Sequence, residues 1–436
     1  MSSGAVRAAD SQRTGATRTR LLILTLVTLA TMLNYLDRSV MSVAKPSMAA
    51  ELQISAATMG FIFSAFSWTY AFAQIPGGAV LDRLGVRLTY AGSLVLWSVA
   101  TFAHGLMSSV AGLFSMRLAL GLAEAPCYPS NSRILNNWFP QTERARATGV
   151  YSVGQYVGVG FMLPVLVWIV ASWGWRSLFF IVGGIGVLYG LVFWTQYRDP
   201  NESSRVNQQE LDLIAEGGGL TAPVARVPFT LRNIGRLLSK RQILGASIGQ
   251  FCGNSTLVFF LTWFPSYLAE ERHMDWIKSG FAASLPYIAA SVGVLFGGFV
   301  SDRIIRATGS ATMGRKLPIV AGLLMCSTMI AANYISDNTV VIAIMSVAFF
   351  GQGMVNLGWT LISDVAPRSM IGLTGGVFNL CANLAGIITP IVVGLVVQNT
   401  GSFYGALAYI GALGLIGAAA YIFIVGDVHR VELDAA

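Results

Sequence analysis

A seven-residue stretch decides the fold, because the chain contains it twice. Residues 77–83 read GGAVLDR and residues 297–303 read GGFVSDR, so five of the seven positions agree at a separation of 220 residues. A weaker echo links TGVY at residues 148–151 with TGGVF at residues 374–378, which carries one inserted glycine. The repeats predict a chain built from two related halves.

The composition places both halves in lipid. Of the 436 residues, 54% are apolar and only 11% are charged, whereas soluble domains carry about 25% charged residues. Apolar runs of about 20 residues, the length that crosses a bilayer as a helix, recur along the chain. Unbroken runs such as residues 178–193 favour helices over the alternating strands of a barrel. We therefore expect an all-α membrane protein, and a soluble globular protein is excluded.

Twelve membrane-spanning helices are expected, six in each half. Their predicted spans are residues 21–43, 57–80, 88–107, 110–130, 147–171, 177–197, 243–268, 278–300, 317–336, 338–360, 371–398 and 402–425. The predicted organisation is a disordered cytoplasmic tail at 1–20, a six-helix bundle at 21–197, a cytoplasmic linker at 198–240, a second six-helix bundle at 241–425 and a cytoplasmic tail at 426–436.

The basic residues indicate the orientation. If the N-terminus is cytoplasmic, most of the 28 Lys and Arg residues fall in cytoplasmic stretches, and the predicted outer loops hold Lys45, Arg176, Arg272 and Lys278. This distribution follows the positive-inside rule, so both termini are expected in the cytoplasm. Basic loops that face anionic lipid also explain the net charge of +8, and no nucleic-acid partner is expected.

Several motifs resemble those of a known transporter family. They are GxxxDRxGxR at 78–87, NYLDR at 34–38, RxxxGxxEAP at 117–126, WFP at 138–140, TWFP at 262–265 and GLTGGVFN at 372–379. The first resembles the signature loop of the major facilitator superfamily. The others resemble its anion:cation symporter branch, and in particular bacterial D-galactonate and D-glucarate transporters. The resemblance implies a major facilitator fold of two pseudo-symmetric six-helix halves.

The repeated loop supplies candidate gating residues. Asp82 and Arg83 follow the second predicted span, and Asp302 and Arg303 occupy the same place in the second half. Acidic and basic side chains there can pair with neighbouring helix termini. We expect these four residues to latch the cytoplasmic side.

Four ionisable side chains fall inside predicted membrane helices: Asp37, Arg38, Arg117 and Glu124. Each such group is costly in lipid and by default indicates a transport pathway or binding site. Asp37 and Arg38 are adjacent, so we expect them to contact different partners. Arg117 and Glu124 are seven residues apart, which places them on one helical face two turns apart.

Charge counting predicts the mechanism. The four groups sum to zero when both carboxylates are ionised, so a bound monoanion requires one proton for neutrality. Because arginine stays charged, the exchangeable protons are expected on Asp37 and Glu124. The alternative is that these charges form permanent pairs that hold helices together, but buried ion pairs stabilise poorly because of their desolvation cost.

The resemblance also implies substrate-binding residues. It assigns Arg38 and Gln155 to the substrate carboxylate, which suits the planar fork of arginine, and Arg117 to the response when Asp37 is protonated. Family resemblance or position on a polar helix face adds further pocket candidates, namely Tyr35, Tyr70, Asn356, Trp359, Thr360, Asn379 and Asn383. Asn356 departs from the pattern, because some galactonate-type relatives are expected to carry a small hydroxyl residue there.

Small residues spaced by four positions predict close helix packing. The pairs are Gly154 with Gly158, Gly293 with Gly297, and Gly372 with Gly376.

The favoured function is proton-coupled import of a sugar-acid anion by alternating access, in the bacterial inner membrane. The alternatives are import of another organic anion, either aromatic or dicarboxylic, and a transport-like nutrient sensor. An enzyme is not expected, because no nucleophile, metal cluster or nucleotide loop occurs at usable spacing. We expect a monomer in the lipid bilayer with no metal and no cofactor other than protons as the coupling ion.

Overall fold

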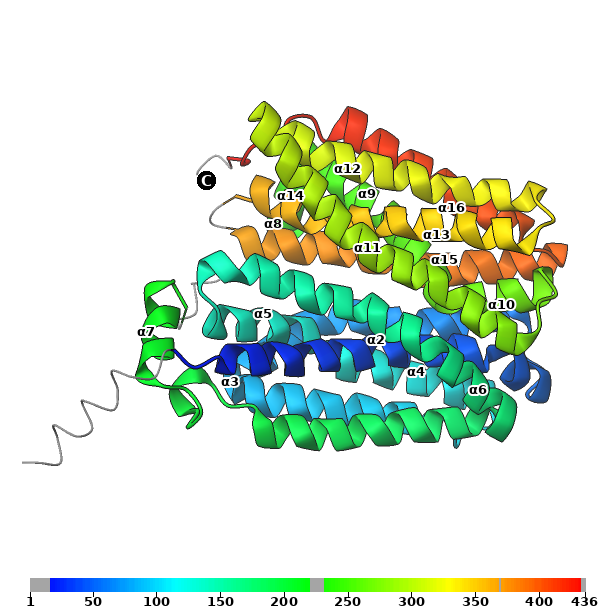
Figure 1. The fold of residues 1–436 in the computed structure, drawn as a ribbon. Coiled ribbons are helices and arrows are strands. Elements are labelled where there is room, and N and C mark those ends of the chain that lie inside the picture. The colour runs from blue at the N-terminus through cyan, green and yellow to red at the C-terminus, as the bar shows by residue number, and fades with distance from the viewer. Residues whose placement is uncertain (1–15, 220–230, 368–369, 433–436) are drawn as a thin grey trace, which may run out of the picture.

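The computed structural model describes residues 16–219, 231–367 and 370–432, and their regular structure is helical. The long helices lie side by side in two groups (Figure 1). The first group comprises α2 to α6, coloured blue to green, and the second comprises α9 to α16, coloured green to red. The start of α2 and the end of the described chain lie at the same end of the molecule, which we call the terminal side; the opposite end is the distal side.

The first group contains five helices. They are α2 (Thr19–Glu51), α3 (Ala56–His104), α4 (Val110–Glu124), α5 (Cys127–Trp138) and α6 (Gln141–Gln196). In the sequence, the two groups are joined by η1 (Pro200–Glu202), α7 (Gln208–Glu216) and α8 (Leu231–Leu238). The second group contains α9 (Arg241–Thr262), α10 (Phe264–Ser266), η2 (Tyr267–Glu271), α11 (Trp276–Thr308), α12 (Ala311–Ser327), η3 (Thr328–Tyr334), α13 (Asn338–Val355), α14 (Gly358–Val365), α15 (Ile371–Thr400), α16 (Tyr404–Ala419) and η5 (Ala420–Ile424).

Two glycines restore the predicted number of crossings. Within the described residues, ten helices are long and apolar enough to cross a membrane. The 49-residue α3 contains Gly85 at φ 75°, and the 56-residue α6 contains Gly174 at φ 80°. Only glycine adopts such a conformation readily, so the chain reverses there without a longer loop. Division of α3 and α6 at these glycines yields twelve crossings, which confirms the predicted all-α membrane architecture.

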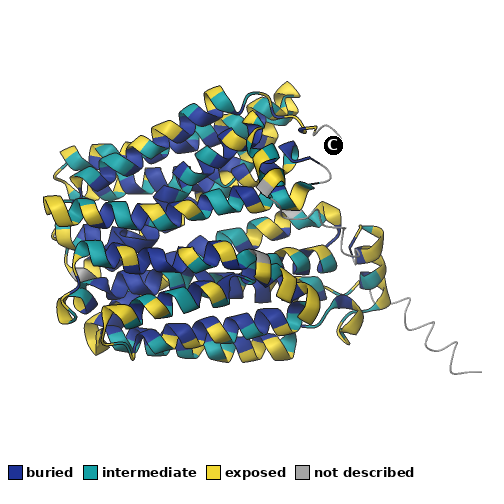
Figure 2. Ribbon diagram, turned by 180° about the vertical axis from the view of Figure 1, so that it is seen from behind, coloured by how far each residue is buried: buried dark blue, intermediate teal, exposed yellow. Residues whose placement is uncertain are grey.

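Large apolar side chains cover the outside of both groups. Phe161, Leu188 and Phe281 are 62%, 65% and 64% exposed, and Figure 2 shows exposed residues on the outward faces and buried ones between the helices. Such a surface suits lipid rather than water.

The linker helix α7 is attached to the start of α2. Glu210 is buried and accepts hydrogen bonds from the Thr17 hydroxyl at 2.6 Å and from the backbone amides of Thr19 and Arg20 at 3.0 and 3.1 Å. Residues 16–20 are therefore held in place, so the predicted disordered tail does not extend to residue 20; residues 1–15 lie outside the described ranges. The boundaries proposed for the two bundles and the linker stay a prediction.

Close packing joins the two groups on the distal side. A methyl group added to Gly60 would collide with the Pro390 carbonyl, and one added to Gly160 would lie 3.2 Å from Cβ of Tyr287. The Ala57 amide also donates to Oε1 of Gln398 at 3.0 Å. On this side α3 therefore meets α15, and α6 meets α11.

The terminal side is packed more openly. Methyl groups added to Gly149, Gly372, Gly375 or Gly376 would meet nothing within 4 Å. The prediction of close packing at Gly372 and Gly376 is therefore wrong in this conformation.

The other two glycine pairs do pack closely, as predicted. A methyl group added to Gly158 would lie 2.9 Å from Cβ of Met32 on α2. One added to Gly297 would lie 3.0 Å from Cα of Met354 on α13. These glycines let neighbouring helices of the same group approach closely.

Candidate substrate and proton site

Arg38 and Glu124 form a buried ion pair between α2 and α4. Nε of Arg38 donates to Oε1 of Glu124 at 2.7 Å, and Nη2 donates to the same oxygen. The Glu124 side chain is fully buried, while that of Arg38 is 14% exposed. The Arg38 side chain is therefore partly accessible to solvent, while the Glu124 side chain is not.

Aromatic rings surround the Arg38 guanidinium. Its Cζ lies 5.0 Å from the ring centroid of Tyr35, 4.8 Å from Phe66 and 4.7 Å from Tyr70. A guanidinium over aromatic faces gains cation–π attraction and is held in a defined orientation. The structure thus brings together three of the predicted substrate residues, Arg38, Tyr35 and Tyr70, and adds Phe66, which sequence reasoning missed.

Asp37 points to a different partner from Arg38. Its Oδ2 accepts a hydrogen bond from Nε1 of Trp97 on α3 at 2.9 Å, and the residue is only 3% exposed. Oδ1 of Asp37 and Oε2 of Glu124 are buried and have no hydrogen-bond partner among the described residues. The adjacent Asp37 and Arg38 side chains therefore serve separate environments, as their spacing predicts.

Arg117 lies near this cluster without joining the ion pair. Its Nη2 donates to the backbone oxygen of Phe63 at 3.3 Å, and its Cζ lies 5.3 Å from the Phe66 ring. The residue is 3% exposed. Its predicted response to protonation of Asp37 stays a prediction.

Gln155 faces a tyrosine that sequence reasoning missed. Oη of Tyr128 donates to Oε1 of Gln155 at 3.0 Å, which joins α5 to α6. Gln155 is 5% exposed. Tyr128 lies between Pro126 and Pro129, and these prolines were the available signal that the segment is irregular near the site.

The second group contributes amides to the boundary between the groups. Nδ2 of Asn379 donates to Oε1 of Gln74 on α3. Asn383 donates to the backbone oxygen of Asn379 at 2.8 Å, and Asn356 donates to Oη of Tyr156 on α6 at 3.3 Å. The predicted residues Asn356 and Asn379 therefore make direct contacts with the first group.

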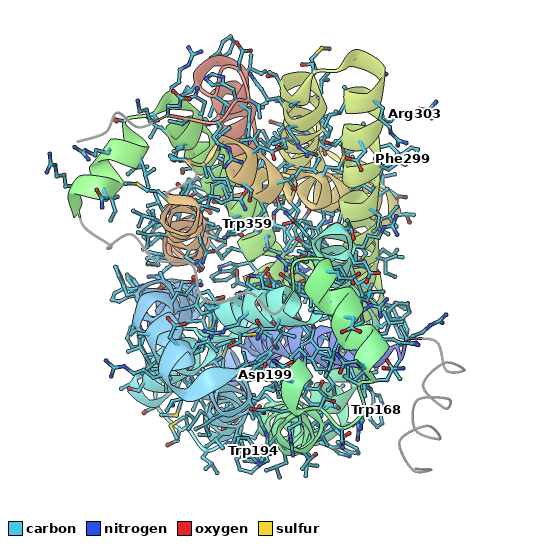
Figure 3. The ribbon with its side chains drawn as sticks, turned by 90° about the vertical axis from the view of Figure 1, so that its left-hand side faces the viewer. Trp168, Trp194, Asp199, Phe299, Arg303 and Trp359 are labelled. Atoms are coloured by element: carbon cyan, nitrogen blue, oxygen red, sulfur yellow. The ribbon has the colours of Figure 1, made fainter. Side chains whose placement is uncertain are left out.

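Trp359 and Thr360 differ from these amides because they are exposed. Both are exposed on α14, and the Trp359 ring packs edge to face on Phe378 with centroids 5.0 Å apart. Figure 3 shows Trp359 on the second group, close to the boundary with the first. Among the described residues, the ring partner of Trp359 is Phe378 and not a ring beside Arg38. The role of Trp359 and Thr360 in substrate binding stays a prediction.

The repeated loops form ion pairs inside each group. Oδ1 of Asp82 accepts from Nη1 of Arg133 on α5 at 2.7 Å. In the second group, Arg315 lies 3.9 Å from Asp302 and bonds Asp364 at 2.9 Å. Arg83 and Arg303 are exposed, and Figure 3 shows Arg303 projecting away from the helices. The proposed latch role of these four residues stays a prediction.

Comparisons with known proteins agree with this architecture. A family model for the Major Facilitator Superfamily matches residues 27–390. The D-galactonate transporter of Escherichia coli O6:H1 is 43% identical over 95% of this chain and 97% of its own length. The probable galactarate/D-glucarate transporter GudP of Escherichia coli K12 is 40% identical over 96% of each chain.

A solved structure shares the fold. The crystal structure of a bacterial homolog of the human lysosomal transporter Spinster, in an inward-facing and unoccupied conformation, superposes with a TM-score of 0.68. The alignment covers 94% of this chain and 96% of that chain at 21% identity.

Helices that cross the membrane many times, with buried charges between them, are typical of a multi-pass membrane transporter. The matched family and the relatives are transporters and not enzymes. The matched family model and the full-length relatives make the assignment specific. The chain belongs to the Major Facilitator Superfamily.

Proposed function

We propose that this protein is a proton-coupled symporter that imports a sugar-acid anion by alternating access. The observation that carries the proposal is the buried Arg38–Glu124 pair, with Asp37 close by on the same helix turn. Relatives named for galactonate and for galactarate or glucarate transport support the substrate class. Another organic anion is the alternative substrate.

The arrangement supports exchange of partners at Arg38. Glu124 accepts both hydrogen bonds from Arg38 through one oxygen, Oε1. A substrate carboxylate can instead accept two parallel hydrogen bonds from the guanidinium, one with each oxygen. If the substrate carboxylate pairs with Arg38, Glu124 is left without its ion-pair partner in a buried site, where an unpaired charge is costly. A proton on Glu124 removes that cost, so proton uptake and anion binding favour each other.

Asp37 offers a second site for a proton. Its Oδ2 accepts a hydrogen bond from Trp97, while its buried Oδ1 accepts none from the described residues. Protonation there would change its attraction to the buried cations nearby and bias the transporter toward one conformation.

The terminal side is proposed to face the cytoplasm of a bacterium, with the protein in the inner membrane and both termini inside. The distribution of bases supports this orientation. The present conformation, packed closely on the distal side and openly on the terminal side, is then an inward-open state. The protein is proposed to act as a monomer.

Uptake into proteoliposomes with an imposed pH gradient tests the proposal. A panel of labelled galactonate, glucarate, galactarate, glucuronate and phthalate identifies the substrate. We expect accumulation of at least one sugar acid, driven by the gradient and abolished by a protonophore. Accumulation of none of the sugar acids would overturn the proposal, and accumulation of phthalate alone would favour the aromatic alternative.

The Asp37→Asn variant tests the role of Asp37 in coupling. We expect gradient-driven uptake to fall at least about a hundredfold while counterflow exchange of substrate stays within about threefold of wild type. Asp337→Asn is the matched control, because Asp337 caps α13 at an exposed position and Asn caps a helix equally well. Equal loss of uptake and exchange, with unchanged thermal unfolding, would contradict a proton-carrying role.

A further inference from the structure

Lys45 is a buried cation that no part of the proposed proton site uses. Its place in the sequence predicts an outer loop, but α2 continues through it to Glu51, and Lys45 is only 5% exposed. Its Nζ pairs with Oε1 of Glu270, which lies in η2 of the second group. The pair therefore joins the two groups on the distal side, where they are closely packed.

The two residues of this pair differ in their exposure to solvent. The Glu270 side chain is 40% exposed, while that of Lys45 is 7% exposed. Nζ of Lys45 also lies 5.4 Å from the ring centroid of Trp263. When the groups separate on the distal side, Lys45 loses Glu270 and Trp263 as neighbours, and its cation becomes available to another anion.

Lys45 lies on the same face of α2 as Arg38. The two residues are seven positions apart, so their side chains share one helical face about 10.5 Å apart along the axis. Lys45 is nearer the distal end of that helix. An anion that enters from the distal side would therefore reach Lys45 before Arg38.

A chain of contacts connects Lys45 with the buried charge cluster. Trp263, beneath Lys45, packs edge to face on Phe63 with centroids 5.4 Å apart. The backbone oxygen of Phe63 accepts the hydrogen bond from Arg117. Separation of Lys45 from Glu270 would thus move a tryptophan that touches the segment holding Arg117.

The position of Glu270 depends on an unusual backbone. Residues Tyr267–Glu271 form a π-helical turn that follows the Pro265 region of α10. Such turns are wider than an α-helical turn and occur frequently at functional sites. The turn presents Glu270 to the first group, whereas Glu271 bonds within its own group to the Ser402 hydroxyl and the Phe403 amide, both at 2.9 Å.

From these contacts we propose that Lys45 exchanges partners during transport: it pairs with Glu270 when the distal side is closed and with the carboxylate of the incoming anion when that side opens. Lys45 is thus the first anion-positioning residue on the path to Arg38. The inference rests on the proposed import of an organic anion.

Comparison of Lys45→Gln with Glu270→Gln separates this role from a simple gate. In cells that express the full chain, we expect Lys45→Gln to raise the external KM for the labelled sugar acid that wild type accumulates by at least about tenfold. We expect Glu270→Gln to leave the KM within about threefold of wild type, because it removes the competing carboxylate and keeps the cation. Lys45→Arg should restore the KM to within about threefold.

The Glu51–Arg176 pair provides the matched control. It lies on the same distal side, but both residues belong to the first group, and their contact does not join the groups. Glu51→Gln should leave the KM unchanged, and thermal unfolding of every variant checks its folding.

Equal KM values for Lys45→Gln and wild type, or equal shifts for Lys45→Gln and Glu270→Gln, would overturn the inference while leaving the proposed function intact. If Lys45→Gln does not fold, the Lys45→Arg variant provides the test. Its KM should be similar to that of wild type and should rise with added chloride, because chloride competes with the substrate carboxylate for the cation. A KM that does not rise with chloride would also overturn the inference. Failure of wild type to accumulate any organic acid would instead reject the proposed function.

Discussion

The interiors of the two groups differ in charge, although the sequence repeats suggest a common origin. The first group buries Asp37, Arg38, Arg117 and Glu124 between its helices. The second group contacts the first through amides such as Asn356 and Asn379, and its charged contact with the first group is Glu270 on the distal side. Under the proposed function, the first group responds to protons and anions, while the second contacts the hydroxyl groups of the substrate.

This contrast implies a division of labour between the groups. Charged hydrogen bonds are roughly twice as strong as neutral ones, so in the proposed mechanism the first group supplies affinity for the substrate carboxylate. Neutral amides can both donate and accept hydrogen bonds, so in the proposed mechanism the second group distinguishes the arrangement of the substrate hydroxyls. Substitutions on the two sides should then affect different measured quantities.

The largest effect is expected from Glu124→Gln in the first group. The variant removes a proton site and leaves Arg38 without its carboxylate, so gradient-driven uptake should fall at least about a hundredfold. Substrate binding should persist, because the substrate carboxylate can take the freed guanidinium. Uptake into proteoliposomes and a substrate-induced thermal shift measure the two quantities.

Asp275→Asn controls for the change from carboxylate to amide, because Asp275 caps α11 at the protein surface. It should retain uptake within about threefold. A Glu124→Gln variant that still accumulates substrate against its gradient would remove the proposed distinction between the groups.

A smaller effect is expected from Asn379→Ala in the second group. Loss of one neutral hydrogen bond costs about 0.5–1.5 kcal/mol, so the KM should rise about threefold to tenfold with unchanged coupling to protons. The ratio of KM values for galactonate and glucarate should change as well, because the amide is proposed to contact hydroxyls. Asn333→Ala, which removes a hydrogen bond to the Tyr404 backbone oxygen within the second group on the distal side, should change neither quantity. A loss of proton coupling in Asn379→Ala would contradict the comparison.

The smallest effect on transport is expected at Glu210, which attaches the linker to the first group. Burial raises the pKa of this carboxyl, but hydrogen bonds from Thr17 and from the amides of Arg20 and Thr19 outweigh burial and hold the pKa below its ordinary value. Its stabilising contribution is therefore complete above the ordinary pKa of 4.5 and is lost as the pH falls through the lowered value.

Glu210→Gln should lower stability at pH 7 by about 1 kcal/mol, the usual cost of losing a helix cap. The difference between variant and wild type should shrink on acidification below about pH 4.5, as thermal unfolding in detergent can show. Glu216→Gln, on the exposed face of α7, should match wild type throughout. A difference that is independent of pH would show that the Glu210 charge is not what holds the linker.

The number and type of helices could be predicted because lipid leaves few alternatives. Each crossing must satisfy its own backbone hydrogen bonds, so an apolar run of sufficient length specifies a helix. The ends of the helices were harder to predict, since α2 extends past its apolar stretch through Lys45 to Glu51. The chain can leave the apolar layer and remain helical, and only tertiary contacts such as the Lys45–Glu270 pair show why it does.

The charged members of the site could also be predicted, because charge inside an apolar helix is conspicuous. Their neutral partners could not. Trp97 and Phe66 look like ordinary core residues in an apolar segment, and their contacts with Asp37 and Arg38 depend on how α3 packs on α2. The same limit explains the failed packing prediction at Gly372 and Gly376, which depends on the conformation as well as on the sequence.

The open glycines of α15 carry a practical consequence. Gly372, Gly375 and Gly376 precede Asn379 by seven, four and three positions, so they share its face, which points toward the first group. A larger side chain at one of these positions has space in the present conformation. It would collide with the first group when the terminal side closes. Valine at one of these positions offers a means of arresting the carrier halfway through its cycle with cargo still able to enter from the terminal side.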